Sequence, residues 1–214
     1  LYDSAYFRSL TPEDASLHIT SAGSNNESLL FVSWDNRPRK QVFVTRSLDS
    51  GDNWEPIQEI AGPDPTLGSY IPFNILVSTQ PEQALLVYQV GEPGGSCTQY
   101  YRVSLYQGQS WSEPLEMLSD TAACPQDNQF INLADGTALL MTSILERPYL
   151  IAWNGSRWSD PQAQSELVGF EDPEIFSQVI LGCHQASLGP GDELSIVGCD
   201  LGDGGDIWAT SRQL

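Results

Sequence analysis

Hydrophobic and polar positions along the chain repeat with a period of about 55 residues. Short apolar runs begin at Leu29, Leu85, Leu139 and Leu194, and each follows a polar or glycine-containing turn. Because a short apolar run between turn signals is typical of a buried strand, each run predicts one strand. Helical periodicity is not evident anywhere, so the pattern predicts an all-β chain.

Other strand candidates flank each run. Those that precede the runs are Ser16–Ser21, Phe73–Ser78, Gln129–Leu133 and Ser177–Cys183. Those that follow the runs are Gln41–Ser47, Gln99–Ser104, Tyr149–Trp153 and Asp206–Ser211. In the first three units a fourth, edge-like strand is expected after the next turn, where proline is tolerated because an edge strand has unpaired N–H positions.

Repeated units of four antiparallel strands are typical of β-propeller blades. The predicted fold is therefore an all-β propeller of about four blades in a single domain, residues 1–214. The predicted blades cover residues 13–60, 70–118, 128–168 and 175–214. The alternative is a β-sandwich with coincidental spacing, which four aligned copies of one strand argue against.

A tight turn follows the third strand of three units. Gly-x-x-Trp recurs at Gly51 and Trp54, at Gly108 and Trp111, and at Gly155 and Trp158. Glycine permits a positive φ in a tight hairpin, and the indole is expected to pack back over the turn. The sequence therefore predicts the same hairpin three times.

The first of these turns carries a more specific motif, Ser47, Asp49, Gly51 and Trp54. It resembles the Asp-box, Ser/Thr-x-Asp-x-Gly-x-x-Trp, of sialidases and other propellers. The two later copies keep Gly and Trp and lose the Asp. The resemblance implies a structural role for the box on the face opposite the active site, with Asp49 accepting local backbone hydrogen bonds.

The fourth unit ends after its third strand. Two explanations stay open: residues Tyr2–Leu10 supply the missing strand and close a four-bladed ring, or the chain is part of a propeller of six or more blades. Asp-box propellers usually have six or more blades, which favours the second explanation.

The chain has 28 acidic and 9 basic residues, a formal net charge of −19 and a pI of about 4.1. A field of this sign repels phosphate backbones and anionic lipid, which argues against nucleic-acid and membrane-surface roles. No apolar stretch approaches the length of a membrane span.

The four cysteines suggest two disulfides, Cys183–Cys199 across a hairpin and Cys97–Cys124 between neighbouring connections. Two bridges imply an oxidising compartment, so an extracellular, periplasmic or cell-surface location is expected. Four buried free thiols are the alternative. Asn26 and Asn154 begin glycosylation sequons, which also arise by chance.

Propeller ligands usually meet the face that carries the links between blades and between second and third strands. Carboxylates, arginines and a tyrosine on that face can hydrogen-bond sugar hydroxyls or a peptide, and solvated loop charges are the plain alternative. The candidates are Asp35, Arg37, Arg39, Tyr70, Glu92, Asp127, Glu146, Arg147, Glu171 and Asp172. Asp127 with Glu171 as a hydrolase pair is unsupported by spacing.

The sialidase resemblance implies an arginine triad, a Tyr–Glu pair and an acidic proton donor. Here Tyr70 occupies the place of the arginine that starts one inner strand, and Arg8 lies too far from the next strand. The complete catalytic set is therefore absent from the sequence, and no residue is assigned as catalytic.

Cofactors are not expected. The acidic, glycine-rich stretch with Asp200, Asp203 and Asp206 offers oxygen ligands for calcium but lacks the EF-hand order, and a flexible loop is the alternative. His18 and His184 are expected on inner strands as packing residues.

The predicted function is non-catalytic binding of a glycan or protein partner outside the cytoplasm. The first alternative is a sialidase-like exo-glycosidase with part of its active site outside these residues. The second is a structural surface or assembly module.

Overall fold

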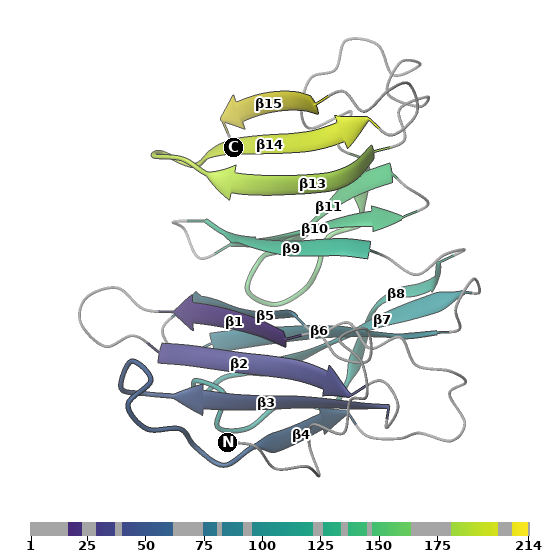
Figure 1. Cartoon of the computed structure of the whole chain (residues 1–214). Helices are drawn as coiled ribbons and strands as arrows, with labels where there is room; N and C mark the ends of the chain where they lie inside the picture. The colour runs from purple at the N-terminus through teal and green to yellow at the C-terminus, as the bar shows by residue number, and fades with distance from the viewer. Residues whose placement is uncertain are drawn as a thin grey trace. The chain divides into compact units, whose positions relative to one another are not determined.

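The computed structural model describes residues 17–22, 29–36, 40–61, 75–80, 83–91, 96–121, 126–133, 137–144, 147–163, 181–200 and 207–213. All the regular elements in these ranges are strands, arranged in four antiparallel sheets (Figure 1). Among these residues no helix is long and apolar enough to cross a membrane. The predicted all-β propeller with about four blades is confirmed.

The chain divides into two compact units, Leu1–Cys124 and Pro125–Leu214, which are described separately. Unit 1 holds two four-stranded blades. The first contains β1 (Leu17–Ala22), β2 (Leu29–Asn36), β3 (Gln41–Ser47) and β4 (Gln58–Ala61) in that spatial order. The second contains β5 (Ile75–Gln80), β6 (Gln83–Gly91), β7 (Cys97–Ser104) and β8 (Leu115–Thr121).

Unit 2 holds the other two blades. The third blade contains β9 (Gln126–Asn132), β10 (Ala138–Ile144), β11 (Arg147–Trp153) and β12 (Gln162–Ala163). The fourth contains β13 (Leu181–Leu188), β14 (Glu193–Asp200) and β15 (Ile207–Gln213). No fourth strand pairs with β15 among the described residues, and Tyr2–Leu10, its predicted supplier, lies outside them.

The predicted second strands are present and extend beyond their apolar runs. In the first blade the ladder continues past Val32 through Trp34↔Phe43, Asp35↔Val42 and Asn36↔Gln41. The polar residues at this end are therefore paired strand residues, although their polarity predicts a loop. The predicted third strands match β3, β7, β11 and β15 closely.

The core of unit 1 lies between its two blades. Phe31 and Val44 of the first blade share one buried cluster with Leu86 and Tyr88 of the second. Burying a side chain of this size stabilises a fold by about 1.5–3 kcal/mol, so this seam holds the two blades together. Trp111, which was expected to pack back over its own turn, packs against the same cluster.

The core of unit 2 is built in the same way. Leu139, Met141 and Leu150 of the third blade form one buried cluster with Leu194 and Ile196 of the fourth. The Gln129 side chain adds a polar link between the blades, because its Oε1 accepts a hydrogen bond from the Ala186 amide at 2.8 Å. Each unit is thus a pair of packed blades.

The predicted register of Cys183 with Cys199 is wrong. The pairs Ala186↔Ile196 and Gln185↔Val197 follow the expected symmetry, but a bulge then shifts the register and sets Gly182 opposite Cys199. A bulge inserts one extra residue into one strand, which sequence symmetry does not reveal.

Cys97 is not a free thiol. Cys124, its predicted partner, lies outside the described residues, so that pairing stays a prediction.

Candidate functional site

Each of the first three blades has two ends that differ in chemistry. The hairpin end carries the turn after the third strand, and the loop end carries the connection between the second and third strands. The hairpin end is described in all three blades, whereas the loop end is described only where its residues belong to strands.

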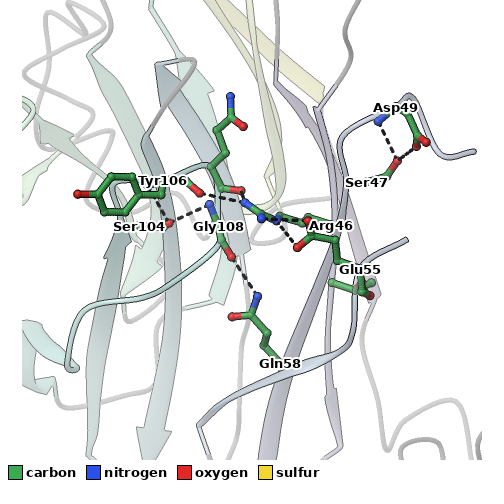
Figure 2. Close-up of polar contacts among 10 residues, drawn as sticks. Arg46, Ser47, Asp49, Glu55, Gln58, Ser104, Tyr106 and Gly108 are labelled. Carbon is green, nitrogen blue, oxygen red and sulfur yellow. Dashed lines mark hydrogen bonds and ion pairs between the residues drawn. The ribbon is translucent and has the colours of Figure 1, made fainter. Parts of the chain in front are cut away.

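At the first hairpin, Ser47 and Asp49 bind the turn together (Figure 2). Ser47 Oγ accepts a hydrogen bond from the Gly51 amide at 2.8 Å and donates one to Asp49 Oδ1 at 2.7 Å. Asp49 accepts two hydrogen bonds from Asn53, one from the amide at 2.8 Å and one from the side chain at 2.7 Å. These donors lower the pKa of the Asp49 carboxyl, with the Asn53 side chain as the largest cause. Asp49 therefore serves the turn, as predicted.

The second hairpin keeps the serine of this arrangement. Ser104 Oγ accepts from the Gly108 amide at 2.8 Å, the same distance and spacing as Ser47 and Gly51 (Figure 2). Tyr106 stands where Asp49 stands in the first copy. The predicted hairpin rested on Gly108 and Trp111 alone, although Ser104, four residues before the glycine, is also visible in the sequence.

The third hairpin is shorter than the other two. In the first hairpin Arg46 O accepts a hydrogen bond from Glu55 N, and in the second Val103 O accepts one from Ser112 N, with eight residues between the partners in each. In the third hairpin Ala152 O accepts the equivalent bond from Ser159 N, with only six residues between them. The shortened turn has its own cap. Asn154 Oδ1 accepts from the amide of Arg157 at 3.0 Å and from that of Ser156 at 3.1 Å. Because the glycine-to-tryptophan spacing is unchanged, sequence spacing alone concealed the deletion.

The prediction of a positive φ at each hairpin glycine is confirmed. The φ angle is +98° at Gly51, +81° at Gly108 and +91° at Gly155. L-residues with a Cβ rarely adopt this left-handed region, so glycine is the residue that permits all three turns.

Arg46 connects the hairpin ends of the two blades of unit 1. Its Nε donates to Glu55 Oε2 at 2.8 Å and its Nη2 to Glu55 Oε1 at 3.1 Å, a bidentate ion pair. Its Nη1 donates to the carbonyl oxygens of Tyr106, at 2.9 Å, and of Gln107 (Figure 2). Gln58 Nε2 adds a bond to Gly108 O at 3.1 Å. This end of unit 1 is thus internally bonded, which fits a scaffold role.

At the loop end, Asp35 is the one predicted candidate whose side chain the structure describes. It lies within β2 and is buried, with 1% exposure, so it is not a solvated loop charge. Asp127 and Arg147 lie in β9 and at the start of β11, where only the backbone is described. The other candidates lie outside the described residues: Arg37, Arg39, Tyr70, Glu92, Glu146, Glu171 and Asp172.

His18 lies beside Asp35 on the inner strands of the first blade. His18 is opposite Ser33 in the β1–β2 ladder, and Asp35 is two residues further along β2, so all three point to one face. Burial lowers the pKa of the His18 imidazole, and the Asp35 charge opposes that shift. We call these three residues the His18 cluster. The sequence placed His18 on an inner strand, as observed, but did not connect it with Asp35.

A second buried polar group lies at the loop end of the second blade. Gln89 and Gln99 are directly opposite in the β6–β7 ladder, with 2% and 1% exposure. Among the described residues, Gln89 Oε1 and Ser33 Oγ are buried without a hydrogen-bond partner. Buried polar atoms are normally hydrogen-bonded, so both atoms are suited to accept a water molecule or ligand.

Burial also affects an ionisable group in the second blade. Burial raises the pKa of the Tyr101 phenol, which lies two residues beyond Gln99 on β7.

The described residues contain no cluster of three acidic, histidine or cysteine residues that could hold a metal ion. Asp203 and Asp206 of the calcium candidate lie outside them, and for Asp200 only the backbone is described. His184 is on β13, and its side chain is not described.

Comparisons with known proteins identify structural relatives only. No protein-family model matches the chain, and no curated protein matches it. The ulvan lyase of the polysaccharide lyase family PL25, solved bound to -[GlcA(1-4)Rha3S]-, is similar with a TM-score of 0.62 at 13% identity. That match covers 90% of this chain and 50% of the lyase.

Two other solved structures are similar over comparable lengths. A second structure of the PL25 ulvan lyase has a TM-score of 0.54 at 10% identity, covering 90% of this chain and 52% of that one. The GH43 protein BlXynB from Bacillus licheniformis has a TM-score of 0.52 at 11% identity, covering 95% and 41%. The chain thus spans about half the length of these proteins or less. It has the β-propeller fold, in common with enzymes that act on glycans.

Proposed function

We propose that the protein binds a glycan at the loop end of its blades. The observation that carries this proposal is the set of buried polar side chains on two neighbouring blades, Ser33, Asp35, Gln89 and Gln99. Ser33 and Asp35 face the seam between the two blades, whereas Gln89 and Gln99 lie on the opposite face of the second sheet. Together they place hydroxyl, carboxylate and amide groups, which suit a hydroxyl-rich ligand, at the loop ends of adjacent blades. Similarity to glycan-active propellers supports the choice of ligand class.

The hairpin end supports the same orientation. We interpret Ser47–Trp54 as an Asp-box, because Ser47 and Asp49 make the hydrogen bonds expected of a structural turn motif. In Asp-box propellers of the sialidase-like superfamily this motif lies opposite the ligand face. A scaffold role for the hairpins leaves the loop end for ligand binding.

Binding to neutral and uronate-containing oligosaccharides tests the proposal, with titration calorimetry as the readout. Asp35→Asn and Gln89→Leu each remove hydrogen-bonding capacity at the loop end, and each is expected to weaken binding about tenfold. Glu113→Ala removes an exposed carboxylate at the second hairpin and is the control that retains binding. Wild-type affinity in both loop-end variants, with wild-type melting temperatures, contradicts the proposal.

A second candidate function is glycan cleavage, for which the His18 cluster is the specific observation. A half-buried imidazole that stays neutral near pH 7 can accept a proton, and a neighbouring carboxylate can orient it. The sialidase-like exo-glycosidase is one form of this candidate. Turnover of a fluorogenic sialoside, of aryl glycosides or of a polyuronate, abolished by His18→Gln, favours catalysis over binding alone.

We also propose that the protein acts outside the cytoplasm. Cys97 is buried and is not a free thiol, which supports a disulfide with Cys124 and an oxidising compartment. Mass spectrometry of unreduced peptides is expected to recover a Cys97–Cys124 linked pair. Recovery of four free thiols from protein purified without reductant contradicts both the bridge and the location.

A further inference from the structure

A concave surface lies at the hairpin end of the third blade. It encloses about 440 Å³, which is the size of a small-ligand site. The residues that line it are Ala152, Asn154, Arg157, Trp158, Ser159, Asp160 and Gln162. All of them belong to the shortened hairpin or to the strands β11 and β12 that it connects.

The floor of this hollow is held in place by aromatic packing. The Trp158 ring lies 5.4 Å from the Trp153 ring and 6.1 Å from the Phe130 ring, measured between centroids, and both contacts are tilted. Trp158 is half-buried and lines the hollow. Because its neighbours restrict the indole, little rotamer entropy remains to be lost when a ligand packs against it.

Hydrogen bonds between side chains and backbone hold the rim. The Arg157 amide donates to Asn154 Oδ1 at 3.0 Å. Ser159 Oγ accepts from the Ala152 amide at 3.0 Å and donates to Asp160 O at 3.0 Å. These bonds fix the backbone that carries Arg157 and Asp160, which favours an organised site.

The charged groups at the rim are not used by the fold. Arg157 and Asp160 are both exposed, and in the part of the chain that the structure describes neither side chain belongs to an ion pair or side-chain hydrogen bond. One guanidinium donor, one carboxylate acceptor and two amide groups surround an indole. The rim bears one charge of each sign, which selects neither an anion nor a cation.

We propose that this hollow, defined by Trp158, Arg157, Asp160 and Gln162, is a second saccharide site that takes a neutral sugar with adjacent hydroxyl groups. An indole packs against the C–H face of a sugar ring, while carboxylate and guanidinium groups suit neighbouring hydroxyls. The formal net charge of −19 opposes an acidic glycan. The inference rests on the proposed function for its ligand class, and it assigns a separate site at the hairpin end of the third blade.

The other two hairpins provide the matched control. Asp160 follows Trp158 by two residues, as Glu113 follows Trp111, and both carboxylates are exposed. Arg157→Ala and Asp160→Ala therefore remove groups of the hollow, and Glu113→Ala removes the equivalent carboxylate of a longer hairpin. Trp158→Ala is avoided, since loss of its packing on Trp153 would also destabilise the fold.

The experiment titrates the bacterially produced chain with a neutral xylo-oligosaccharide and with an oligogalacturonate. Arg157→Ala and Asp160→Ala are expected to weaken xylo-oligosaccharide binding about tenfold each, while Glu113→Ala and the melting temperatures stay unchanged. Wild-type affinity in both variants overturns the inference, as does preference for the oligogalacturonate or no binding of the neutral sugar.

The loop-end variant separates this inference from the proposed function. Binding that survives Asp35→Asn and is lost in Asp160→Ala supports the hairpin site and contradicts the loop-end site. Binding that is lost in Asp35→Asn and survives in Asp160→Ala overturns the hairpin site and leaves the proposed function standing. Two binding events, each lost in one variant, support both sites.

Discussion

Arg46 Nη1 of the first blade donates a hydrogen bond to the Tyr106 carbonyl oxygen of the second blade at 2.9 Å. The same guanidinium is held by Glu55 through two further bonds, so its five donors are largely satisfied. The Arg46 side chain has 7% exposure and that of Glu55 38%. A half-shielded bidentate pair of this kind fixes an orientation as well as adding stability, and here it orients one hairpin against the next.

Replacement of Arg46 by methionine is expected to destabilise unit 1 by roughly 2–3 kcal/mol, because the Tyr106 and Gln107 carbonyl oxygens lose their donor and Glu55 loses its ion-pair partner. Urea unfolding followed by tryptophan fluorescence measures the change. Arg102→Met is the control, since Arg102 Nη1 donates to Ser112 O within a single blade. It is expected to cost about 1 kcal/mol, and equal losses in the two variants contradict a special role for the link between blades.

Gly108 and Gly155 share a positive φ but differ in their surroundings. A Cβ on Gly108 would lie 2.4 Å from Phe31 Cε1, whereas nothing lies within 4 Å of a Cβ on Gly155. Gly155→Ala is expected to cost about 1 kcal/mol, from backbone strain alone. Gly108→Ala adds overpacking and is expected to cost roughly 3 kcal/mol. Thermal unfolding compares them, and partial rescue of Gly108→Ala by Phe31→Leu is the check on the cause.

The repeating fold was predictable because it depends on period and turn chemistry. Apolar runs about 55 residues apart and Gly-x-x-Trp turns are local patterns; all four blades carry the run, and the first three carry the turn. Polar residues inside strands were harder to place. Asp35 follows a tryptophan and precedes a basic stretch, so its polarity suggested a loop, whereas the β2–β3 ladder includes it.

The unpredicted features depend on contacts between segments that are distant in sequence. Arg46 meets Tyr106 sixty positions away, and His18 faces Asp35 only after β1 pairs with β2. The bulge near Cys183 is not visible in the symmetric spacing of Cys183 and Cys199 about their turn. The two-residue deletion in the third hairpin is not visible in the spacing from glycine to tryptophan. Long-range packing and register shifts therefore account for what the patterns did not reveal.

The Asp49 carboxyl is expected to titrate below its ordinary value of 3.8, because Asn53 and Ser47 donate to the ionised form. A lowered folded-state pKa means that the stabilisation is present above pH 3.8 and is lost as the pH falls through the folded value. Carbon-detected NMR titration measures the pKa. Asn53→Ala and Ser47→Ala are each expected to raise it, and an unchanged value in both variants contradicts the hydrogen-bond explanation.

His18 provides the corresponding test at the loop end, where burial holds the pKa of its imidazole below the ordinary value of 6.5. Because the unfolded state then binds the proton more tightly, stability is complete above about pH 6.5 and falls as the pH drops toward the folded value. The chain has two histidines, so proton NMR with a His184→Gln variant assigns the signal. Asp35→Asn removes the charge that raises the pKa of His18, so the value is expected to fall further. A rise in that variant shows that Asp35 does not act on the imidazole through its charge.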